Sequence, residues 1–362
     1  MLYKTIIASL ALAGILSAAG CSEPSGNAPQ WAWPDPDSGT GEIPEPEPEQ
    51  TETNPDIVSL GWKNVEDEFG ALPEGIAIYR SPEQLEGKNA IAYIAVADLS
   101  KAGYDIWSIS DPESDGTDEP FMTPSEVYGA EGNGQPAVVI NGGFFYMSGS
   151  KYYTSSLAVR NGKLLSPNIN YASEDWVTIY YPTRAAFVEH KDGSFEACWT
   201  YYVSSAAHYA YPEPASNSWS SAPAAQPSAS FPEGAETFEA ETAIGGGPLL
   251  IRDGVIRNTY VEELFDGPTG IAPDSDQPRT AIGTTSDGRM ILFVCEGRQK
   301  TEGVAGLLTE DVANVLLDLG CTQAVNLDGG GSSCMLVNGH ETIKPSDGAQ
   351  RRVASTVMLM QR

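Results

Sequence analysis

Basic residues are scarce in this chain. Its 362 residues include 20 Lys and Arg against 49 Asp and Glu, so the formal net charge is −29. Nucleic acids and anionic membrane surfaces need a basic field, and the composition argues against both as general partners. A ligand that carries phosphate would have to be held by a few local arginines. Hydrophobic residues still make up 41% of the chain, which is enough to form a core.

Histidine is also scarce, and the common catalytic motifs are missing. The three histidines, His190, His208 and His340, are far apart, and no His-Glu-x-x-His motif occurs. The glycine runs lack the Lys-Ser/Thr ending of a phosphate-binding P-loop, and no Gly-x-Ser-x-Gly elbow exists. We therefore expect no metal and no cofactor. A metal-dependent phosphoesterase stays a weaker alternative, because carboxylates are plentiful but show no ligand spacing.

No hydrophobic run is long enough for a spanning helix, which needs ~20 residues. The short apolar run Ile6–Leu16 instead favours a signal peptide over residues 1–20, and the small residues before Cys21 resemble a lipobox. We predict lipidation at Cys21, with an ordinary signal peptide as the alternative, and a Pro/Glu-rich tether over residues 21–55. The expected location is the bacterial cell envelope. Ser22 favours the outer membrane, and the lipid would be the only membrane contact.

The remaining residues, 56–362, are predicted to form a single catalytic domain. Its four cysteines show no metal-type spacing, so we expect buried free thiols and keep disulfides as the alternative. These cysteines are Cys198, Cys295, Cys321 and Cys334.

Turn dipeptides between apolar runs indicate the fold class. Such pairs accept the backbone of tight hairpins, so we predict an α+β fold with an antiparallel-rich mixed sheet system and a few packed helices. The dipeptides are Asn161-Gly162, Asp192-Gly193, Asp253-Gly254, Asp287-Gly288 and Asn338-Gly339. Further strands are expected at Ile91–Ala97, Ala137–Ile140, Trp176–Tyr181, Ala324–Leu327 and Val353–Met360.

Two helices and one insertion complete the expected organisation. A helix capped by Thr309 should end at Gly320, and a shorter one should begin at Thr123-Pro124. Residues 204–241 are rich in Ser, Ala and Pro and have little periodicity. We interpret this segment as a loop insertion, either a lid over a cleft or a solvated excursion.

Polar residues follow five apolar strands. Carboxylates, arginines and glycine turns at strand ends can together form a cleft for an anionic ligand, because turn N–H groups and guanidinium groups bind anions. The five segments are Asn141-Gly-Gly-Phe-Phe145, Gly245-Gly-Gly-Pro248, Pro278-Arg-Thr-Ala-Ile-Gly283, Glu296-Gly-Arg298 and Asn326-Leu-Asp-Gly-Gly-Gly-Ser332.

This ordered series resembles the phosphodiester glycosidase family over roughly residues 90 to 360. The family usually has Asp-Gly-Arg where this chain has Glu296-Gly-Arg298, and Glu-Leu-Ala where it has Asp311-Val-Ala313. Both departures keep a carboxylate but change its reach by one methylene. The resemblance implies hydrolysis of a sugar-1-phosphodiester, of the N-acetylglucosamine-1-phosphate type, at the glycosidic carbon, on cell-surface or extracellular glycans.

The resemblance also implies roles for site residues. Glu296 and Asp328 are the predicted catalytic carboxylates, acting as base or nucleophile. The predicted substrate- and phosphate-binding residues are Asn141, Gly142, Gly246, Arg279, Thr280, Arg298, Asn326, Gly329, Gly330, Ser332 and Arg352. Arg279 and Arg298 would clamp the phosphate, while Arg351 and Arg352 could add a cation or brace the last strand.

A different class of function stays open. The chain could be a non-catalytic surface glycan-binding lipoprotein, with the two carboxylates acting as braces. An aromatic cluster would then stack on sugars; its members are Trp199, Tyr201, Tyr202 and Trp219.

Overall fold

The fold is described here from a computed structural model, which describes residues 56–130, 132, 134–267 and 270–362. The predicted signal peptide, Cys21 and the tether lie outside the described residues. All of the described residues belong to one compact unit. About 39% of the structure is strand and 7% is helix, so the predicted α+β class is broadly compatible but the helices are few.

Three sheets form the body of this unit, and every ladder between the described strands is antiparallel, so the predicted mixed character is absent there. The large sheet has the order β1 (Lys63–Asn64), β2 (Ile76–Arg80), β5 (Ala92–Asp98), β20 (Arg289–Cys295), β19 (Arg279–Thr285), β21 (Cys321–Asn326), β17 (Leu249–Arg252) and β18 (Val255–Ile256). The seven-stranded sheet has the order β11 (Lys163–Ser166), β10 (Ala158–Arg160), β16 (Thr242–Gly245), β12 (Arg184–Glu189), β13 (Phe195–Ser204), β14 (Ala207–Tyr211) and β15 (Glu236–Thr237).

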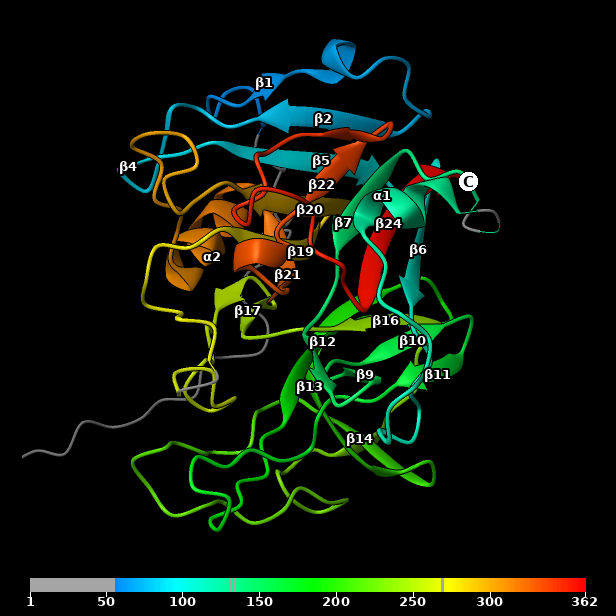
Figure 1. Ribbon diagram of the computed structural model, residues 1–362, viewed down its shortest axis with the longest axis vertical. Coiled ribbons are helices and arrows are strands. Elements are labelled where there is room, and N and C mark those ends of the chain that lie inside the picture. The colour runs from blue at the N-terminus through cyan, green and yellow to red at the C-terminus, as the bar shows by residue number, and fades with distance from the viewer. Residues whose placement is uncertain (1–55, 131, 133, 268–269) are drawn as a thin grey trace, which may run out of the picture. The chain divides into compact units, whose positions relative to one another are not determined.

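The five-stranded sheet places β24 between β7 and β6 (Figure 1). Its order is β23 (His340–Glu341), β22 (Met335–Val337), β7 (Val138–Asn141), β24 (Ser355–Gln361) and β6 (Ala102–Ser108). The other elements are the hairpins β3 (Gln84–Leu85) with β4 (Lys88–Asn89) and β8 (Phe145–Ser148) with β9 (Lys151–Thr154), the helices α1 (Pro124–Gly129) and α2 (Thr309–Asp318), and the 3-10 turns η1 (Glu66–Glu68) and η2 (Gly330–Ser332).

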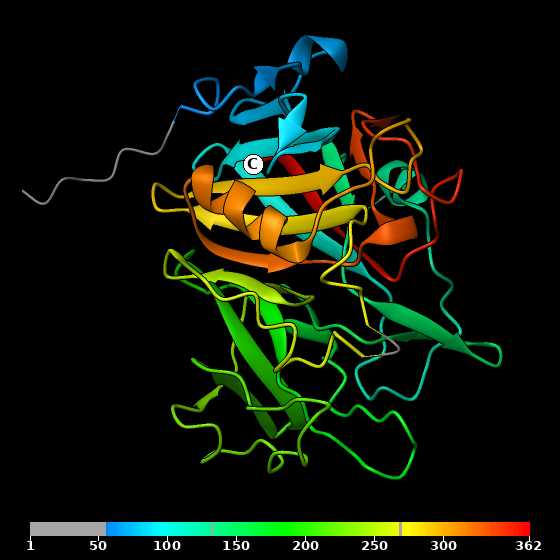
Figure 2. The ribbon, with the colours of Figure 1, turned by 90° about the vertical axis from the view of Figure 1, so that its left-hand side faces the viewer.

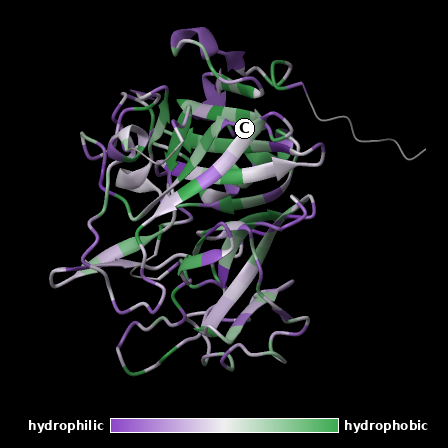
Figure 3. Cartoon of the chain, turned by 90° about the vertical axis from the view of Figure 1, so that its right-hand side faces the viewer, coloured by the Kyte–Doolittle hydropathy of each residue, from purple (hydrophilic) through white to green (hydrophobic). Residues whose placement is uncertain are grey.

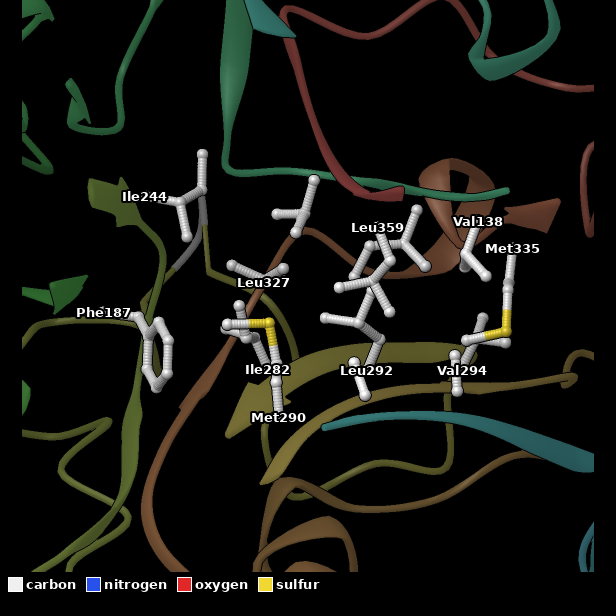
Figure 4. Packing of buried hydrophobic residues seen from close by; sticks show 14 of the residues in the cluster. Val138, Phe187, Ile244, Ile282, Met290, Leu292, Val294, Leu327, Met335 and Leu359 are labelled. Atoms are coloured by element: carbon white, nitrogen blue, oxygen red, sulfur yellow. The ribbon is translucent and has the colours of Figure 1, made fainter. Parts of the chain in front are cut away.

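Both faces of the large sheet are buried, as strand β20 shows. Side chains of a strand alternate between the two faces. Met290, Leu292 and Val294 enter the core that all three sheets share, which Figure 4 shows in close view. Ile291 and Phe293 point to the opposite face, where α2 packs (Figure 2). This burial explains the continuous apolar run of β20, and the strands of the large sheet are accordingly mostly hydrophobic in Figure 3.

The predicted hairpins are confirmed. Each of the five turn dipeptides joins two paired strands, and Asn161 and Gly162 adopt φ values of 52° and 70°. Such positive φ angles are what a two-residue turn requires, and Asn and Gly tolerate them best.

The helix predictions are confirmed with a shifted cap. The apolar stripe on one side of α2 and its C-cap, Val312, Val315, Leu316 and Leu319, is buried, and Gly320 follows with φ 86°. The N-cap is Leu308 rather than Thr309, because the Asp311 carboxylate accepts the Leu308 N–H at 2.7 Å while the Thr309 hydroxyl donates to a carbonyl. Helix α1 begins after Thr123 with a reciprocal capping box.

The predicted strand at Trp176–Tyr181 is wrong. The segment is a series of bends, and Trp176 has φ 61° and is 82% exposed. The Asp175 carboxylate accepts the N–H groups of Val177 and Thr178 at 2.8 and 2.7 Å. A side chain thus satisfies donors that would otherwise bond to a neighbouring strand.

Residues 204–241 are only partly irregular. Strands β14 and β15 lie within the segment and extend the seven-stranded sheet, which leaves an irregular excursion over residues 212–235.

The four cysteines of the domain are buried free thiols, as predicted. Among the described residues, no helix has the length and apolarity to cross a bilayer.

Candidate functional site

The site is built around the glycine turn that follows β21. Asp328 lies two residues beyond the end of β21, and residues 330–332 form the 3-10 turn η2, with Gly330 at φ 61°. A Cβ on Gly329 would lie 2.7 Å from the Pro278 carbonyl oxygen, and one on Gly331 would overlap Arg351 and Asp347. The glycines therefore allow backbone and charged side chains to approach the turn closely.

Asn141 and Thr280 hold this turn in place from two other sheet strands. The Asn141 amide donates to the Asp328 carbonyl at 2.6 Å, and its Oδ1 accepts the Thr280 hydroxyl at 2.8 Å and the Cys334 N–H at 3.1 Å. The Gly142 carbonyl accepts the Asp328 N–H at 3.0 Å. Asn141 and Thr280 are both buried and partnered, so they position the turn in this structure.

Asp328 has an unusual electrostatic environment. Desolvation raises the pKa of its carboxyl to about 6, while a hydrogen bond from the Ser332 hydroxyl, the charge of Arg351, the Gly329 N–H and the charge of Arg298 oppose that rise. A carboxyl with a pKa close to neutrality is suited to proton transfer at physiological pH.

Two arginines, Arg298 and Arg351, flank the turn, and both lie close to the Asp347 carboxylate. Arg351 donates to Asp347 at 2.5 Å through Nη2 and to the Ser332 hydroxyl at 3.3 Å through Nη1. Arg298 donates to the Gln277 side chain at 2.8 Å and lies 3.7 Å from Asp347. The arginine side chains are 40% and 44% exposed, so both retain access to solvent and to a ligand. Asp347 was not identified from the sequence, since nothing marks it in an ordinary polar loop.

Arg279 is not placed to clamp a phosphate, contrary to its predicted role. It is 1% exposed, and its guanidinium donates to four backbone carbonyls at 2.6 to 3.0 Å. Three of them belong to residues 271, 272 and 275, and the fourth to Leu307. Burial lowers the pKa of Arg279 to about 10. The side chain braces a loop, which leaves little of its donor capacity for an anion.

Glu296 is buried but is not joined to Asp328. Its Oε2 accepts the Lys344 N–H at 3.3 Å, and its Oε1 has no hydrogen-bond partner. No hydrogen bond links Glu296 to Asp328 within the described part of the chain. A buried carboxylate oxygen without a hydrogen-bond partner lowers the stability of the folded protein, and Glu296 Oε1 is such an atom directly after β20.

Arg352 lies away from the turn, contrary to its predicted binding role. Its guanidinium donates to the Phe121 carbonyl at 2.8 Å and pairs with Glu126 of α1. The physical reason is local. Consecutive residues in an extended segment point to opposite sides, so only Arg351 faces the glycine turn.

Asn326 and Gly246 connect the turn to a pocket. The Asn326 amide donates to the Gly247 and Leu327 carbonyls at 2.8 Å each, and its Oδ1 is buried without a partner. A Cβ on Gly246 would overlap the Asn326 carbonyl oxygen. Gly246 must therefore be glycine for these two strands to approach, and it also lines the pocket.

The pocket has a volume of about 460 Å³, and six of its fourteen lining residues are aromatic. Phe144 and Phe265 form part of its wall, with ring centroids 5.2 Å apart, and Arg184 and Gly246 supply polar and backbone surface. Phe144 follows Gly142 by two residues, so the pocket adjoins the segment that contacts Asp328. No residue of the 204–241 segment lines this pocket, and the lid interpretation gains no support here.

Sequence reasoning also missed Glu263, which is fully buried behind this region. Its carboxylate accepts four hydrogen bonds, from Trp199 Nε1, the Thr259 hydroxyl and the N–H groups of Leu249 and Ala185. Burial raises the pKa of Glu263 to about 7 against these bonds. It lies in an irregular segment with no motif, so no local pattern could have identified it.

The residues that the structure describes hold no group of three or more His, Cys, Asp or Glu side chains arranged to bind a metal ion.

The chain belongs to the phosphodiester glycosidase family, whose model matches residues 134–360. This span includes all five strand-end segments, from Asn141 to Ser332. The family assignment agrees with the resemblance seen in the sequence.

Particular relatives match over short segments. A stretch of 82 residues is 38% identical to the SPbeta prophage-derived uncharacterized protein YomE of Bacillus subtilis, covering 23% of this chain and 12% of that protein. A stretch of 72 residues is 38% identical to human N-acetylglucosamine-1-phosphodiester alpha-N-acetylglucosaminidase, covering 20% of this chain and 13% of the enzyme. The matches thus span only about an eighth of the length of these relatives.

Solved structures share the fold more broadly. The catalytic domain of zebrafish N-acetylglucosamine-1-phosphodiester alpha-N-acetylglucosaminidase matches with a TM-score of 0.51 and 19% identity, over 81% of this chain and 85% of that one. A hypothetical protein from Synechocystis matches with a TM-score of 0.51 and 17% identity, over 80% and 62% of the respective chains. At such identities the likeness concerns the fold.

Proposed function

We propose that the protein hydrolyses a sugar-1-phosphodiester, of the N-acetylglucosamine-1-phosphate type, at the glycosidic carbon. Membership of the phosphodiester glycosidase family supports a hydrolase. The observation that carries the proposal is the Asp328 carboxyl, whose pKa is raised to about 6 in a glycine turn flanked by Arg298 and Arg351.

In the proposed reaction the bond between the anomeric carbon and the phosphate oxygen breaks, and the phosphate leaves with the bonding electron pair as a monoester. Phosphate is a good leaving group, so the site mainly needs to stabilise the departing anion and supply a nucleophile. Arg298 and Arg351 provide the positive charge. Asp328 either takes a proton from the attacking water or attacks the anomeric carbon itself, and the ionised carboxylate is required for both.

The experiment compares Asp328→Asn with Asp318→Asn, which changes an exposed carboxylate at the end of α2. The substrate is the methyl phosphodiester of α-N-acetylglucosamine-1-phosphate, and release of N-acetylglucosamine is measured. We expect the Asp328 variant to lose about 10²–10⁴-fold in kcat and the control to lose nothing. A folded Asp328→Asn protein with full turnover would remove this carboxylate from the mechanism.

Two further measurements resolve the roles of the carboxylates. Glu296→Gln tests the second predicted catalytic residue: a loss of about 10²–10⁴-fold in kcat would assign it a part in the reaction, and an unchanged kcat would exclude it. Proton NMR of the released sugar reports its anomeric configuration. Retention would indicate a double displacement through a nucleophile, and inversion would indicate direct attack by a water that a general base activates.

The alternative, a non-catalytic glycan-binding protein, loses part of its sequence support. Trp199 and Tyr201 are 0% and 1% exposed and belong to the core, so they are not free to stack on a sugar, whereas Tyr202 lines a second cavity and Trp219 is partly exposed. Glycan binding without turnover on the phosphodiester would still favour this alternative.

We also propose that the protein is a lipoprotein of the bacterial cell envelope, attached through Cys21. The proposal rests on the apolar run and on the small residues before this cysteine. Incorporation of radiolabelled palmitate into the wild type but not into Cys21→Ser would support it.

A further inference from the structure

The pocket beside the glycine turn contains an arginine whose guanidinium donates no hydrogen bond to any residue that the structure describes. Arg184 begins β12 and is 8% exposed. Its Nε is buried without a partner, and its guanidinium makes no hydrogen bond or ion pair with any residue that the structure describes. Its guanidinium carbon lies over the Phe265 ring, 4.1 Å from the ring centroid.

Arg184 remains charged in this environment. Burial lowers its pKa to about 10, and the charge of Glu263 counteracts this effect. The guanidinium is therefore protonated at neutral pH. Burying a guanidinium whose N–H donors lack acceptors is unfavourable even when a carboxylate acts on its charge from a distance, so a protein seldom keeps one in its interior without a function. An anionic ligand in the pocket would supply the missing acceptors, because guanidinium donors match phosphate and carboxylate oxygens.

The rim of the same pocket presents an exposed tryptophan. Trp176 is 82% exposed and lines the pocket. Its turn is preorganised by Asp175, whose carboxylate accepts two backbone N–H groups and the Thr178 hydroxyl, and these bonds lower the pKa of Asp175 to about 2. An indole held out in this way costs little to order on binding, and a sugar ring can lie against its face.

We propose that this pocket binds a phosphorylated sugar, with Arg184 donating to the phosphate and Trp176 covering a face of the sugar. The assignment of the ligand rests on the proposed function. The volume of about 460 Å³ is within the range of small-molecule sites. Two residues of the pocket wall, Phe144 and Gly246, are close in sequence or in space to the backbone that holds Asp328, so the pocket adjoins the glycine turn, although Asp328, Arg298 and Arg351 do not themselves line it.

The phosphate part is tested with Arg184→Met, which removes the charge and keeps an apolar side chain against Phe265. Isothermal titration of the mature chain with N-acetylglucosamine-1-phosphate and with inorganic phosphate measures binding, and thermal unfolding measures stability. We expect at least tenfold weaker binding of both ligands and an equal or higher melting temperature. Arg289→Met, at a distant hairpin, should change binding by less than twofold and controls for the lost charge.

A structural role for Arg184 gives a different result. The variant would then melt at a lower temperature, and either that outcome or unchanged binding overturns the proposal. If Arg184→Met does not fold, Arg184→Lys keeps the charge in the pocket. Retained but weaker phosphate binding by this variant supports the assignment, and wild-type affinity refutes it.

The sugar part is tested with Trp176→Ala and its matched neighbour Val177→Ala, which is 83% exposed on the same turn. Trp176→Ala should weaken binding of the sugar phosphate at least fivefold and leave binding of inorganic phosphate unchanged, while Val177→Ala should change neither. Equal affinity of the two variants for the sugar phosphate would remove Trp176 from the site.

The two proposals fail separately. If the wild type binds the sugar phosphate through Arg184 but releases no N-acetylglucosamine from the diester, the hydrolase proposal fails and the binding site stands. If hydrolysis proceeds and Arg184→Met leaves both KM and ligand binding unchanged, the hydrolase stands and this inference fails.

Discussion

Replacing Asn141 by Asp tests whether this side chain positions the Asp328 turn, because the change alters a single group with almost no change in shape. The amide nitrogen that donates to the Asp328 carbonyl at 2.6 Å becomes an oxygen. The two donors on the other side, the Thr280 hydroxyl and the Cys334 N–H, keep their acceptor. The change affects only the contacts of this nitrogen, which are the bond to the Asp328 carbonyl and a long one, at 3.4 Å, to the Gly142 carbonyl, which still accepts the Asp328 N–H.

The expected magnitude follows from the burial of this group. Asn141 is 0% exposed, so the variant loses one hydrogen bond and leaves a buried carbonyl without a donor, which costs about 1–3 kcal/mol. An ionised carboxylate facing that carbonyl adds a further desolvation cost, for a total of about 3–5 kcal/mol at pH 8. Protonation relieves this cost, since a neutral carboxyl can donate to the carbonyl again. The pKa of the introduced Asp is thus raised in the folded state above its unfolded value of about 3.9, and its destabilisation grows as the pH rises above that value.

The assay is thermal and urea unfolding of the wild type and Asn141→Asp at pH 5 and pH 8. The difference between the two proteins should be clearly larger at pH 8. Thr280→Val serves as the matched control, because it removes one donor to the same oxygen and should cost about 1 kcal/mol at both pH values. A variant as stable as the wild type at pH 8, or a loss independent of pH, would refute the assigned hydrogen bonds.

Three further predictions concern the site. Turnover should rise with pH through about pH 6, since the Asp328 carboxyl must be ionised, and this limb should be absent from the residual activity of Asp328→Asn. Arg351→Gln removes a charge that lowers the pKa of Asp328, so the rising limb of the pH–rate profile should move to higher pH. Arg352 contacts Glu126 instead, so Arg352→Gln should leave the position of this limb unchanged. Gly246→Ala should lower the melting temperature and abolish turnover, because the added Cβ would overlap the Asn326 carbonyl oxygen. Gly129→Ala, where a Cβ would meet open space, should do neither. Normal turnover of Gly246→Ala would contradict this packing.

The sequence alone determined the features that depend on local backbone preferences. The hairpin turns at Asn161-Gly162 and its four counterparts, the apolar stripe of α2 and the capping box of Thr123 all follow from interactions within a few residues. The strand-end motifs were also sufficient to indicate the family, and they identified Asp328, the carboxyl with the perturbed pKa.

Only the tertiary structure decided which charged groups are neighbours. Arg279 and Arg298 looked equivalent in sequence, yet the first is used by four carbonyls and the second remains accessible beside the glycine turn. Arg184 and Glu263 belong to no motif, and their importance comes from burial by distant segments. Local sequence sets turns and periodicity, but the partner of a guanidinium or carboxylate is chosen by long-range packing, which no short pattern encodes.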